Sequence, residues 1–456
     1  MTITSYLLLF YGWLWNGPLL LLLAVTSLIL TYQLRGRQFF LLRSTWSAFS
    51  ADHSCDEGDV SHLESLAMTL AGAVGTGSIV GVATAISIGG MGALLWMWVG
   101  ALLTMVIKYG ESLLALKYRS FDESGRAVGG PMHYMEQGLG WRKAPLLVAF
   151  LGLLATLFSY NMVQVHAMTA TASQLLGLSP WLSASFIALA VGLVLFGGVV
   201  LLGRVASWLV PFMSLLYLLT GSYLLWLHLD RLPSLLVHIG YGAFYGPAMA
   251  GGVAGTATLW LALQMGFSTS LFANEAGLGL PAIATAAAKS CSPARQGLIA
   301  MVGALLTTLL VCTMTALVIG VTEVHLDTAL NGSTMAMEAF ARELPGGAFI
   351  LSICLVLFAY STMLAWAYYG ERCFAYLGGS LSLYRLLYLL AIFPAALLPL
   401  ETIWALGNLA NGLLLLPNLC ALYAMRKVIA EETQLYYEQK RRSKEHLVTK
   451  SEPCSL

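Results

Sequence analysis

The sequence predicts an all-α protein that crosses a lipid bilayer about eleven times, and both its composition and its patterning favour this fold class. Apolar residues make up 58% of the 456 residues and charged residues only 10%, whereas soluble domains carry about 25% charged residues. Long apolar stretches recur along the chain, with lysine and arginine gathered in alternate connections. Because a soluble domain of this composition would expose large apolar patches, lipid is the expected surrounding.

Charge and cysteine usage exclude several other classes of protein. The formal net charge is +1, and no broad basic surface is present to neutralise phosphates, so no nucleic-acid partner is expected. The seven cysteines are scattered singly, without the spacing of a zinc site or a disulfide framework. The sequence has no HExxH motif and no pair of intramembrane aspartates, so neither an enzyme nor an organic cofactor is expected.

A membrane-spanning helix needs about 20 mostly apolar residues. Two candidates are weak as continuous helices, because one is rich in glycine and the other holds several polar side chains. The first candidate lacks a basic leader and a small-residue cleavage site, so we expect a retained span and not a signal peptide. The eleven candidates lie near residues 13–34, 66–88, 91–116, 146–173, 180–201, 205–228, 250–275, 297–321, 347–369, 383–398 and 402–425.

The distribution of lysine and arginine predicts the orientation of the chain. Basic residues fall in alternate connections and in the tail, whereas the connection near 322–345 is acidic. Since cytoplasmic loops carry the excess of lysine and arginine, we expect a multi-pass protein of the inner (plasma) membrane. Its N-terminus would lie outside and its C-terminus in the cytoplasm.

The two weak spans, 66–88 and 250–275, are five helices apart. Interrupted segments at matching places in two halves are typical of inverted-repeat transporters with a midplane site. Because five is odd, the two blocks enter the membrane from opposite sides, as an inverted repeat requires. We therefore predict an N-terminal helix and loop, a first repeat, an extracellular connection, a second repeat and a charged cytoplasmic tail, at residues 1–65, 66–228, 229–249, 250–425 and 426–456.

The first interruption is the glycine-rich stretch 71–78, Ala-Gly-Ala-Val-Gly-Thr-Gly-Ser. Glycine allows the backbone to leave helical dihedral angles, and a break at mid-membrane frees N–H groups for a carboxylate and C=O groups for Na⁺. Irregular backbone at that depth is tolerated only where it lines a cavity. Close helix packing through small residues is the alternative interpretation.

The second interruption is the polar stretch 268–277, which contains Asn274 and Glu275. An intramembrane glutamate predicts a functional site, although Glu275 could equally cap or pair at the cytoplasmic end of its helix. Lys108 and Glu111 lie one turn apart in the third helix, which suggests an ion pair or gate contact, or alternatively a proton relay.

Several ordered motifs resemble the alanine-or-glycine:cation symporter family of amino-acid carriers. They cover about residues 57–375. They include Gly75-Thr76-Gly77-Ser78-Ile79, Gly129-Gly130-Pro131-Met132, Asn161-Met162-Val163-Gln164, Phe272 to Gly279, and Ser361-Thr362 through Trp366 to Cys373.

The resemblance implies a leucine-transporter-type 5+5 inverted repeat with one extra N-terminal helix, and sodium-coupled uptake of a small neutral amino acid, above all alanine or glycine. Carried over onto this sequence, it implies substrate-binding residues at Thr76, Gly77, Ser78, Gln164, Phe272, Gly277, Thr362 and Trp366. It implies one sodium ion at Ala71, Val74, Ser361 and Thr362, and a second near Ala73 and Ser78.

The sequence departs from the family at Ser78, where the pattern usually has asparagine. A shorter ligand here leaves the substrate and the sodium stoichiometry open. Proton coupling and a larger neutral amino acid such as glutamine therefore remain alternatives, and a channel or membrane scaffold is the alternative from another class. The sequence sets no oligomeric state, and a monomer is compatible with it.

Overall fold

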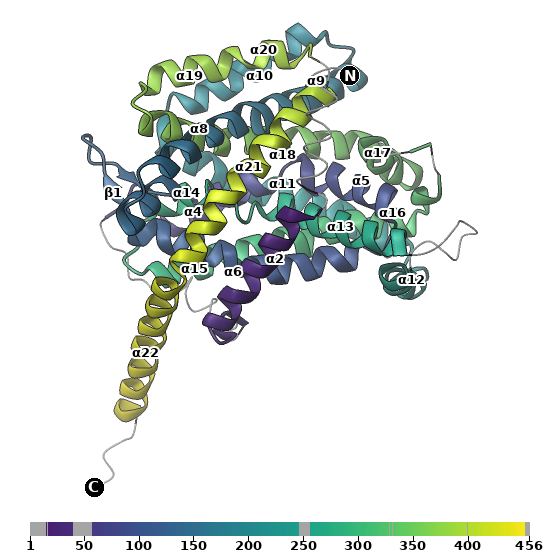
Figure 1. The fold of residues 1–456 in the computed structure, drawn as a ribbon. Coiled ribbons are helices and arrows are strands. Elements are labelled where there is room, and N and C mark those ends of the chain that lie inside the picture. Colours follow the sequence, from purple (N-terminus) through teal and green to yellow (C-terminus); the bar gives the residue numbers. More distant parts are fainter. Residues whose placement is uncertain are drawn as a thin grey trace.

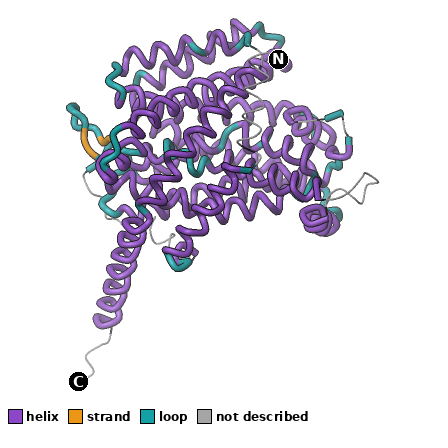
Figure 2. Tube along the Cα trace, in the orientation of Figure 1, coloured by secondary structure: helices purple, strands orange, loops and turns teal. Residues whose placement is uncertain are grey.

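The computed structural model describes residues 15, 17–39, 57–245, 256–327, 329–330, 332–398 and 400–451. Helices pack side by side into one bundle, from which the C-terminal helix projects (Figures 1 and 2). Strands β1 (Ser120–Phe121) and β2 (Ala127–Val128) form a short antiparallel hairpin. We call the end of the bundle that carries this helix, α22, the tail end.

The first half of the chain contains a broken helix and a set of long apolar helices. α4 and α5 are bent by 63° across a short break that holds the 3₁₀ turn η1. The elements are α2 (Pro18–Gln33), α4 (His62–Ala73), η1 (Thr76–Ser78), α5 (Val80–Gly89), α6 (Ala93–Lys117), α7 (Pro131–His133), η2 (Tyr134–Gly138), α8 (Lys143–Leu157), η3 (Phe158–Met162), α9 (Val163–Leu176), α10 (Pro180–Leu195), α11 (Gly198–Leu227) and α12 (Leu232–Tyr245).

The second half begins with α13 and runs to the projecting helix α22. Its elements are α13 (Thr256–Asn274), α14 (Ala282–Ala286), α15 (Pro293–Leu306), η5 (Thr307–Cys312), α16 (Thr313–Val321), η6 (Val324–Leu326), α17 (Gly332–Glu343), α18 (Gly347–Tyr376), α19 (Leu381–Leu390), α20 (Ile392–Ala395), α21 (Leu400–Ala424) and α22 (Arg426–Ser451). The turns η3 and η5 are π-helical and join their flanking helices without ending them.

The helices are long and apolar enough to span a bilayer several times. In the described ranges, six continuous helices meet this requirement, or seven if the bent pair α4–α5 counts as one span. Three shorter apolar helices, Pro18–Gln33, Pro180–Leu195 and Leu381–Ala395, lie in other predicted spans. The starts of the predicted spans 13–34 and 250–275 fall partly outside the described residues.

Two connections contain helices that the sequence analysis did not predict. α12 lies in the connection 229–249 and exposes Val237, Tyr241 and Phe244 on one face while it buries Leu235 and Ile239 on the other. α17 lies in the acidic connection near 322–345. Both are too short to span a bilayer.

Candidate functional site

The first break exposes backbone groups between α4 and η1. Val74 ends α4 with ψ 75°, and its N–H still bonds the Leu70 carbonyl. Gly75 follows, and a Cβ at this position would lie 2.6 Å from Oγ1 of Thr362 on α18. A side chain here would force either the Thr362 hydroxyl or α18 to move, so the close approach favours glycine. The predicted glycine-rich interruption therefore coincides with a real break in the helix.

The second break follows α13 and is longer. Glu275, Gly277 and Gly279 all have positive φ, of 53°, 89° and 77°, and regular helix resumes only at Ala282. Glutamate rarely adopts such an angle, so the surrounding structure must hold it there.

Buried polar side chains hold this second break. Lys108 Nζ donates to the Glu275 carbonyl at 3.4 Å, and Asn418 Nδ2 donates to the Gly277 carbonyl at 2.7 Å. Glu111 Oε1 accepts from the Gly279 N–H at 3.0 Å and from Asn418 at 2.6 Å. Lys108 and Glu111 thus satisfy the unwound backbone of a distant segment instead of serving only as a pair on α6.

A cavity of about 400 Å³ lies between the two breaks. Its wall extends along α5 as far as Ile88, away from the tail end. Of the predicted substrate-binding residues, five line it: Thr76, Gly77, Gln164, Phe272 and Thr362. Further lining residues include Trp15, Ser159, Tyr160, Gln264, Ser268, Glu275, Trp404, Asn408 and Asn411.

Several predicted substrate residues contact side chains from other parts of the chain at this cavity. Thr76 Oγ1 donates to Gln164 Oε1 at 3.0 Å, which links the first break to α9. The Phe272 ring stacks on Trp15, with centroids 4.8 Å apart. Trp366 lies behind the wall, stacks on Tyr160 with centroids 3.4 Å apart, and donates to Glu275 Oε1 at 2.6 Å.

Two predicted substrate residues lie away from the cavity wall. Gly277 packs against Leu415, since a Cβ there would come within 2.5 Å of that side chain. Ser78 is fully buried; its carbonyl accepts from Thr315 at 2.9 Å and its hydroxyl faces the Cys312 thiol.

The predicted sodium ligands gather where α18 meets the end of α4. Thr362 Oγ1 lies 3.1 Å from the Ala71 carbonyl and 3.4 Å from that of Gly72. Ser361 Oγ lies 3.3 Å from the Ala71 carbonyl and also bonds the Phe358 carbonyl of its own helix at 2.9 Å. Val74 is buried and Ala73 lines the cavity. Neutral hydroxyl and carbonyl oxygens are suitable ligands for a hard cation.

Glu275, for which the sequence left two interpretations open, lies on the cavity wall. One lining feature was not predicted from the sequence. The π-helical turn η3 presents Ser159 and Tyr160 to the cavity. Single π-turns inside helices are frequent at functional sites, but no residue pattern of the sequence marked this one.

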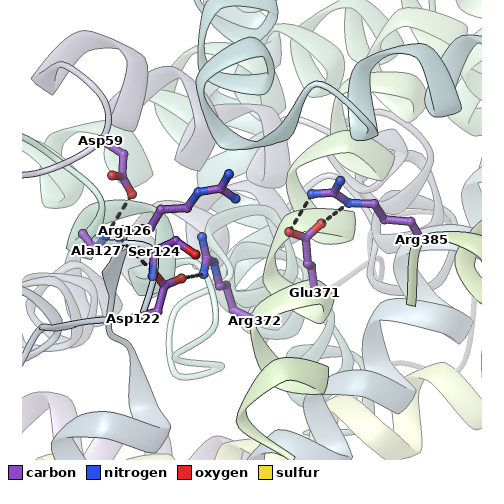
Figure 3. Close-up of polar contacts among 8 residues, drawn as sticks. All are labelled: Asp59, Asp122, Ser124, Arg126, Ala127, Glu371, Arg372 and Arg385. Atoms are coloured by element: carbon purple, nitrogen blue, oxygen red, sulfur yellow. Dashed lines mark hydrogen bonds and ion pairs between the residues drawn. The ribbon is translucent and has the colours of Figure 1, made fainter. Parts of the chain in front are cut away.

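Polar contacts join the hairpin to neighbouring segments of the bundle (Figure 3). Asp122 of the hairpin accepts from the backbone N–H groups of Ser124 and Arg126, each at 2.9 Å, and pairs with Arg372 of α18 at 3.2 Å. Although partial burial opposes it, these hydrogen bonds hold the pKa of Asp122 below its ordinary value. The hairpin is thereby fastened to α18.

The chain just before α4 is fastened to the same place. Asp59 accepts from the Ala127 N–H at 3.1 Å, and burial raises the pKa of this carboxyl despite that bond. The Val60 carbonyl accepts from the Lys289 N–H at 2.8 Å, and Arg119 donates to the Ala288 carbonyl at 2.9 Å. The segments that precede α4 and follow α14 are therefore joined to each other and to the hairpin.

Broken helices around a central cavity, within a bundle of apolar spanning helices, define a multi-pass membrane transporter. The fold agrees with that class. The solved structure of MhsT in complex with L-phenylalanine superposes with a TM-score of 0.60 at 14% identity, over 83% of this chain and 93% of that one. A Na⁺-coupled sialic acid symporter superposes with a TM-score of 0.52 at 13% identity, over 92% and 86%.

The chain belongs to the Sodium:alanine symporter family, whose profile matches residues 1–450. It is 37% identical to the sodium/alanine symporter AgcS of Methanococcus maripaludis, over 93% of this chain and 95% of that protein. It is 31% identical to a probable sodium/glutamine symporter, GlnT, of Bacillus subtilis, over 95% and 90%. Both family and fold are those of secondary transporters and not of enzymes.

Proposed function

We propose that this protein is a sodium-coupled symporter that carries a small neutral amino acid, alanine or glycine, into the cell. The observation that carries the proposal is the pair of breaks on the two sides of one cavity, with neutral oxygens and backbone N–H groups gathered at the first break. Membership of a sodium:alanine symporter family supports this substrate and this ion. The 37% identity to AgcS supports them further.

The proposed architecture is a 5+5 inverted repeat with α2 outside it. Each repeat opens on a broken helix, which places the two breaks together at mid-membrane. The first repeat would comprise α4–α5, α6, α8–α9, α10 and α11, and the second α13–α14, α15–α16, α18, α19–α20 and α21. The domain boundaries predicted above follow from this division, with the connection at 229–249 between the repeats.

The substrate carboxylate would bind at the N-terminal end of η1 and α5. The N–H groups of Thr76 and Gly77 lie at the first break beside the cavity, and helix N-termini favour anions. Gln164, held by Thr76 at 3.0 Å, would complete this edge. Phe272 would cover the substrate side chain, and Ser78, Gly277 and Trp366 would shape the site from behind the wall.

One sodium ion would bind between α4 and α18, at Ala71, Val74, Ser361 and Thr362. The hydroxyl of Thr362 already lies within 3.4 Å of two α4 carbonyls, so a small shift would let an ion replace these hydrogen bonds. A second ion would lie nearer the substrate, by Ala73 and Ser78. The C-terminal end of α4 carries partial negative charge, which favours a cation at both places.

The orientation proposed from the basic tail makes the tail end cytoplasmic. The contacts of Asp59, Asp122 and Arg372 would then close the cytoplasmic side (Figure 3), and the cavity would extend toward the outside. This is the arrangement expected before substrate enters. A cysteine near Asn331 should react with an impermeant thiol reagent from outside and one near Ser124 should not; reversed labelling would overturn the orientation.

Glutamine is the second candidate substrate. GlnT, at 31% identity, is a probable sodium/glutamine symporter. A cavity of about 400 Å³ falls within the range that holds drug-sized ligands, so its walls and not its volume must select the smaller side chain.

Uptake into proteoliposomes tests the proposal directly. Purified protein should accumulate labelled alanine or glycine when a Na⁺ gradient alone is imposed, and much less when a pH gradient alone is imposed. A panel that includes glutamine sets the substrate. Accumulation that follows the pH gradient and ignores Na⁺ would replace sodium coupling with proton coupling.

A further inference from the structure

Glu275 is a buried carboxylate on the wall of the cavity. It is the first residue after α13, its φ is 53°, and only 1% of its surface is exposed. Oε1 accepts a hydrogen bond from Trp366 Nε1 at 2.6 Å. Oε2 is buried and has no hydrogen-bond partner among the residues that the structure describes. A buried carboxylate oxygen without a partner is costly, which suggests that a ligand supplies the missing donor.

The free oxygen lies against the C-terminal end of α4. A Cβ built on Gly72 would come within 3.1 Å of Glu275 Oε2 and within 3.4 Å of Trp366 Nε1. Helix C-termini carry partial negative charge. The Glu275 carboxylate and the α4 carbonyls together therefore form a strongly negative corner of the cavity.

The buried cation Lys108 contacts the backbone of Glu275 and not its carboxylate. Its Nζ bonds the Glu275 backbone carbonyl at 3.4 Å. Glu111, one turn along α6, is also buried, and its Oε1 accepts from Gly279 and Asn418. One ammonium group thus serves two carboxylates, and within the described ranges no ion pair shorter than 4.0 Å forms at Glu275.

The opposite corner of the cavity has the other polarity. Thr76 and Gly77 lie at the start of the helical segment Thr76–Gly89, formed by η1 and α5, and line the cavity with Gly72 and Glu275. Backbone N–H groups at such a start favour an anion. The cavity is therefore bipolar. The Thr76 and Gly77 amides form its positive corner, and Glu275 of the second break forms its negative corner together with the end of α4.

We infer that Glu275 binds the α-ammonium group of the transported amino acid through Oε2, while the Thr76 and Gly77 amides bind its carboxylate. The inference rests on the proposed function and restricts its substrates to zwitterions with adjacent ammonium and carboxylate groups. Trp366 is a positioning residue, because its indole N–H fixes Oε1 and turns Oε2 toward Gly72. A carboxylic acid with a hydroxyl or hydrogen in place of the ammonium would leave Oε2 unpaired and bind poorly.

Calorimetric titration of the purified full-length protein at saturating NaCl tests this assignment. The wild type should bind L-alanine and show no binding of L-lactate or propionate. Glu275→Gln, which keeps the size and removes the charge, should weaken alanine binding by about tenfold or more, as expected for loss of a charged hydrogen bond. Glu275→Asp should lie between the two. Thermal unfolding of each variant checks that it folds.

A second variant keeps the test open if Glu275→Gln does not fold. Gly72→Ala places a methyl group against Oε2 without changing any charge, and it should also weaken alanine binding. Unchanged alanine affinity in both folded variants would overturn the inference and leave the proposed function intact. The inference is likewise overturned if Glu275→Gln alters Na⁺ binding without amino acid and leaves alanine affinity unchanged at saturating Na⁺. A wild type that binds no amino acid would overturn the proposed function as well.

Discussion

The two breaks differ in how their free backbone groups are satisfied. At the first break, carbonyls at the end of α4 accept hydrogen bonds from neutral hydroxyls, and Thr362 Oγ1 lies 3.1 Å from the Ala71 carbonyl. At the second break, the buried charged residues Lys108 and Glu111 and the amide of Asn418 bind the backbone directly. Weak neutral contacts can be exchanged for a ligand, whereas charged contacts in a buried place cannot be given up cheaply.

This difference suggests a division of roles. The first break is the exchangeable one, suited to bind ions and a carboxylate during each cycle. The second is held by buried polar side chains, and Glu275 of this break lies on the cavity wall. The following variants test this contrast, beginning with the one expected to have the largest effect.

Removing the buried ammonium group that holds the second break should be the most damaging change. Lys108→Met takes an ammonium away from the Glu275 carbonyl and leaves two buried carboxylates without a cation. Breaking a buried charge cluster in this way costs about 3–5 kcal/mol. We expect a large fall in thermal stability in detergent, with partial recovery in the double variant Lys108→Met/Glu111→Gln.

Lys117→Met is the matched control on the same helix. Lys117 pairs with Glu432, but both side chains are partly exposed, at 32% and 19%, so the loss should be about 1 kcal/mol or less. Equal stability of the Lys108 and Lys117 variants would show that the charge of Lys108 does not stabilise the second break.

Gly75→Ala should be the next most damaging change, because the first break depends on close approach and not on charge. The new Cβ would lie 2.6 Å from Thr362 Oγ1, so the hydroxyl must leave the Ala71 carbonyl or α18 must shift. Overpacking of this kind costs about 1–3 kcal/mol. Gly77→Ala is the control, since no atom lies within 4 Å of a Cβ there. Thermal unfolding should separate the two variants, and similar curves would contradict the close-contact explanation.

The sequence predicted the first break better than the second for a physical reason. Glycines in 71–78 mark a local loss of helix propensity, which is readable without tertiary structure. The second break is held by Lys108 and Glu111, which are 167 and 168 residues away from the carbonyl and N–H that they bind. Within one helix they resembled a local ion pair. Asn418, in an ordinary apolar helix, gave no sign of its role.

Contacts between distant parts of the chain likewise limit what the sequence predicts about the site residues. Thr76, Gln164 and Thr362 line the cavity as the motifs implied. Glu275 was open to two interpretations because its position along the membrane depends on where α13 ends, and helix ends are poorly fixed by sequence. The tail-end contacts of Asp122 and Arg372 join residues 250 positions apart, so only the fold brings them together.

Thr362→Ala should raise the Na⁺ concentration needed for half-maximal uptake. It removes one hydroxyl ligand from the first break and leaves the second untouched, and an unpaired ligand position costs about 1–3 kcal/mol. Uptake of labelled alanine at graded Na⁺ should show a shift of about tenfold. Thr362→Ser, which keeps the hydroxyl, should shift it much less. Equal shifts would assign the effect to the lost methyl group and not to the oxygen.

Asp122→Asn should weaken the tail-end closure, with an effect that depends on pH. Since its folded-state pKa is lowered, ionised Asp122 contributes stability above its ordinary pKa, and this is lost as pH falls through the lowered value. The pair is partly exposed, so the contribution should be about 1 kcal/mol or less. Melting temperatures of wild type and variant should differ at neutral pH and converge in acid. A constant difference at all pH values would exclude this ion pair as its source.

Ser78→Asn should have the smallest effect and the most informative direction. Ser78 is fully buried at the end of the first break, and α5 has no side-chain hydrogen bond at its N-terminal cap, so a capping role does not explain the serine. An asparagine amide reaches further than a serine hydroxyl and can extend past the Cys312 thiol toward the proposed second ion by Ala73.

We expect the half-saturating Na⁺ concentration of Ser78→Asn to fall by about threefold. This corresponds to a gain in binding free energy smaller than the roughly 1.4 kcal/mol that a tenfold change would need. Preference should also shift toward alanine and glycine over glutamine, because an ion and a substrate that share a ligand bind more cooperatively. Competition uptake against labelled alanine measures both changes. Thr315→Val is the control: it removes the hydrogen bond to the Ser78 carbonyl at 2.9 Å, together with those to Tyr217 and Val311, and leaves residue 78 itself unchanged. If Ser78→Asn leaves selectivity and Na⁺ response unchanged while it lowers thermal stability, residue 78 acts in packing against α16 and not in coupling.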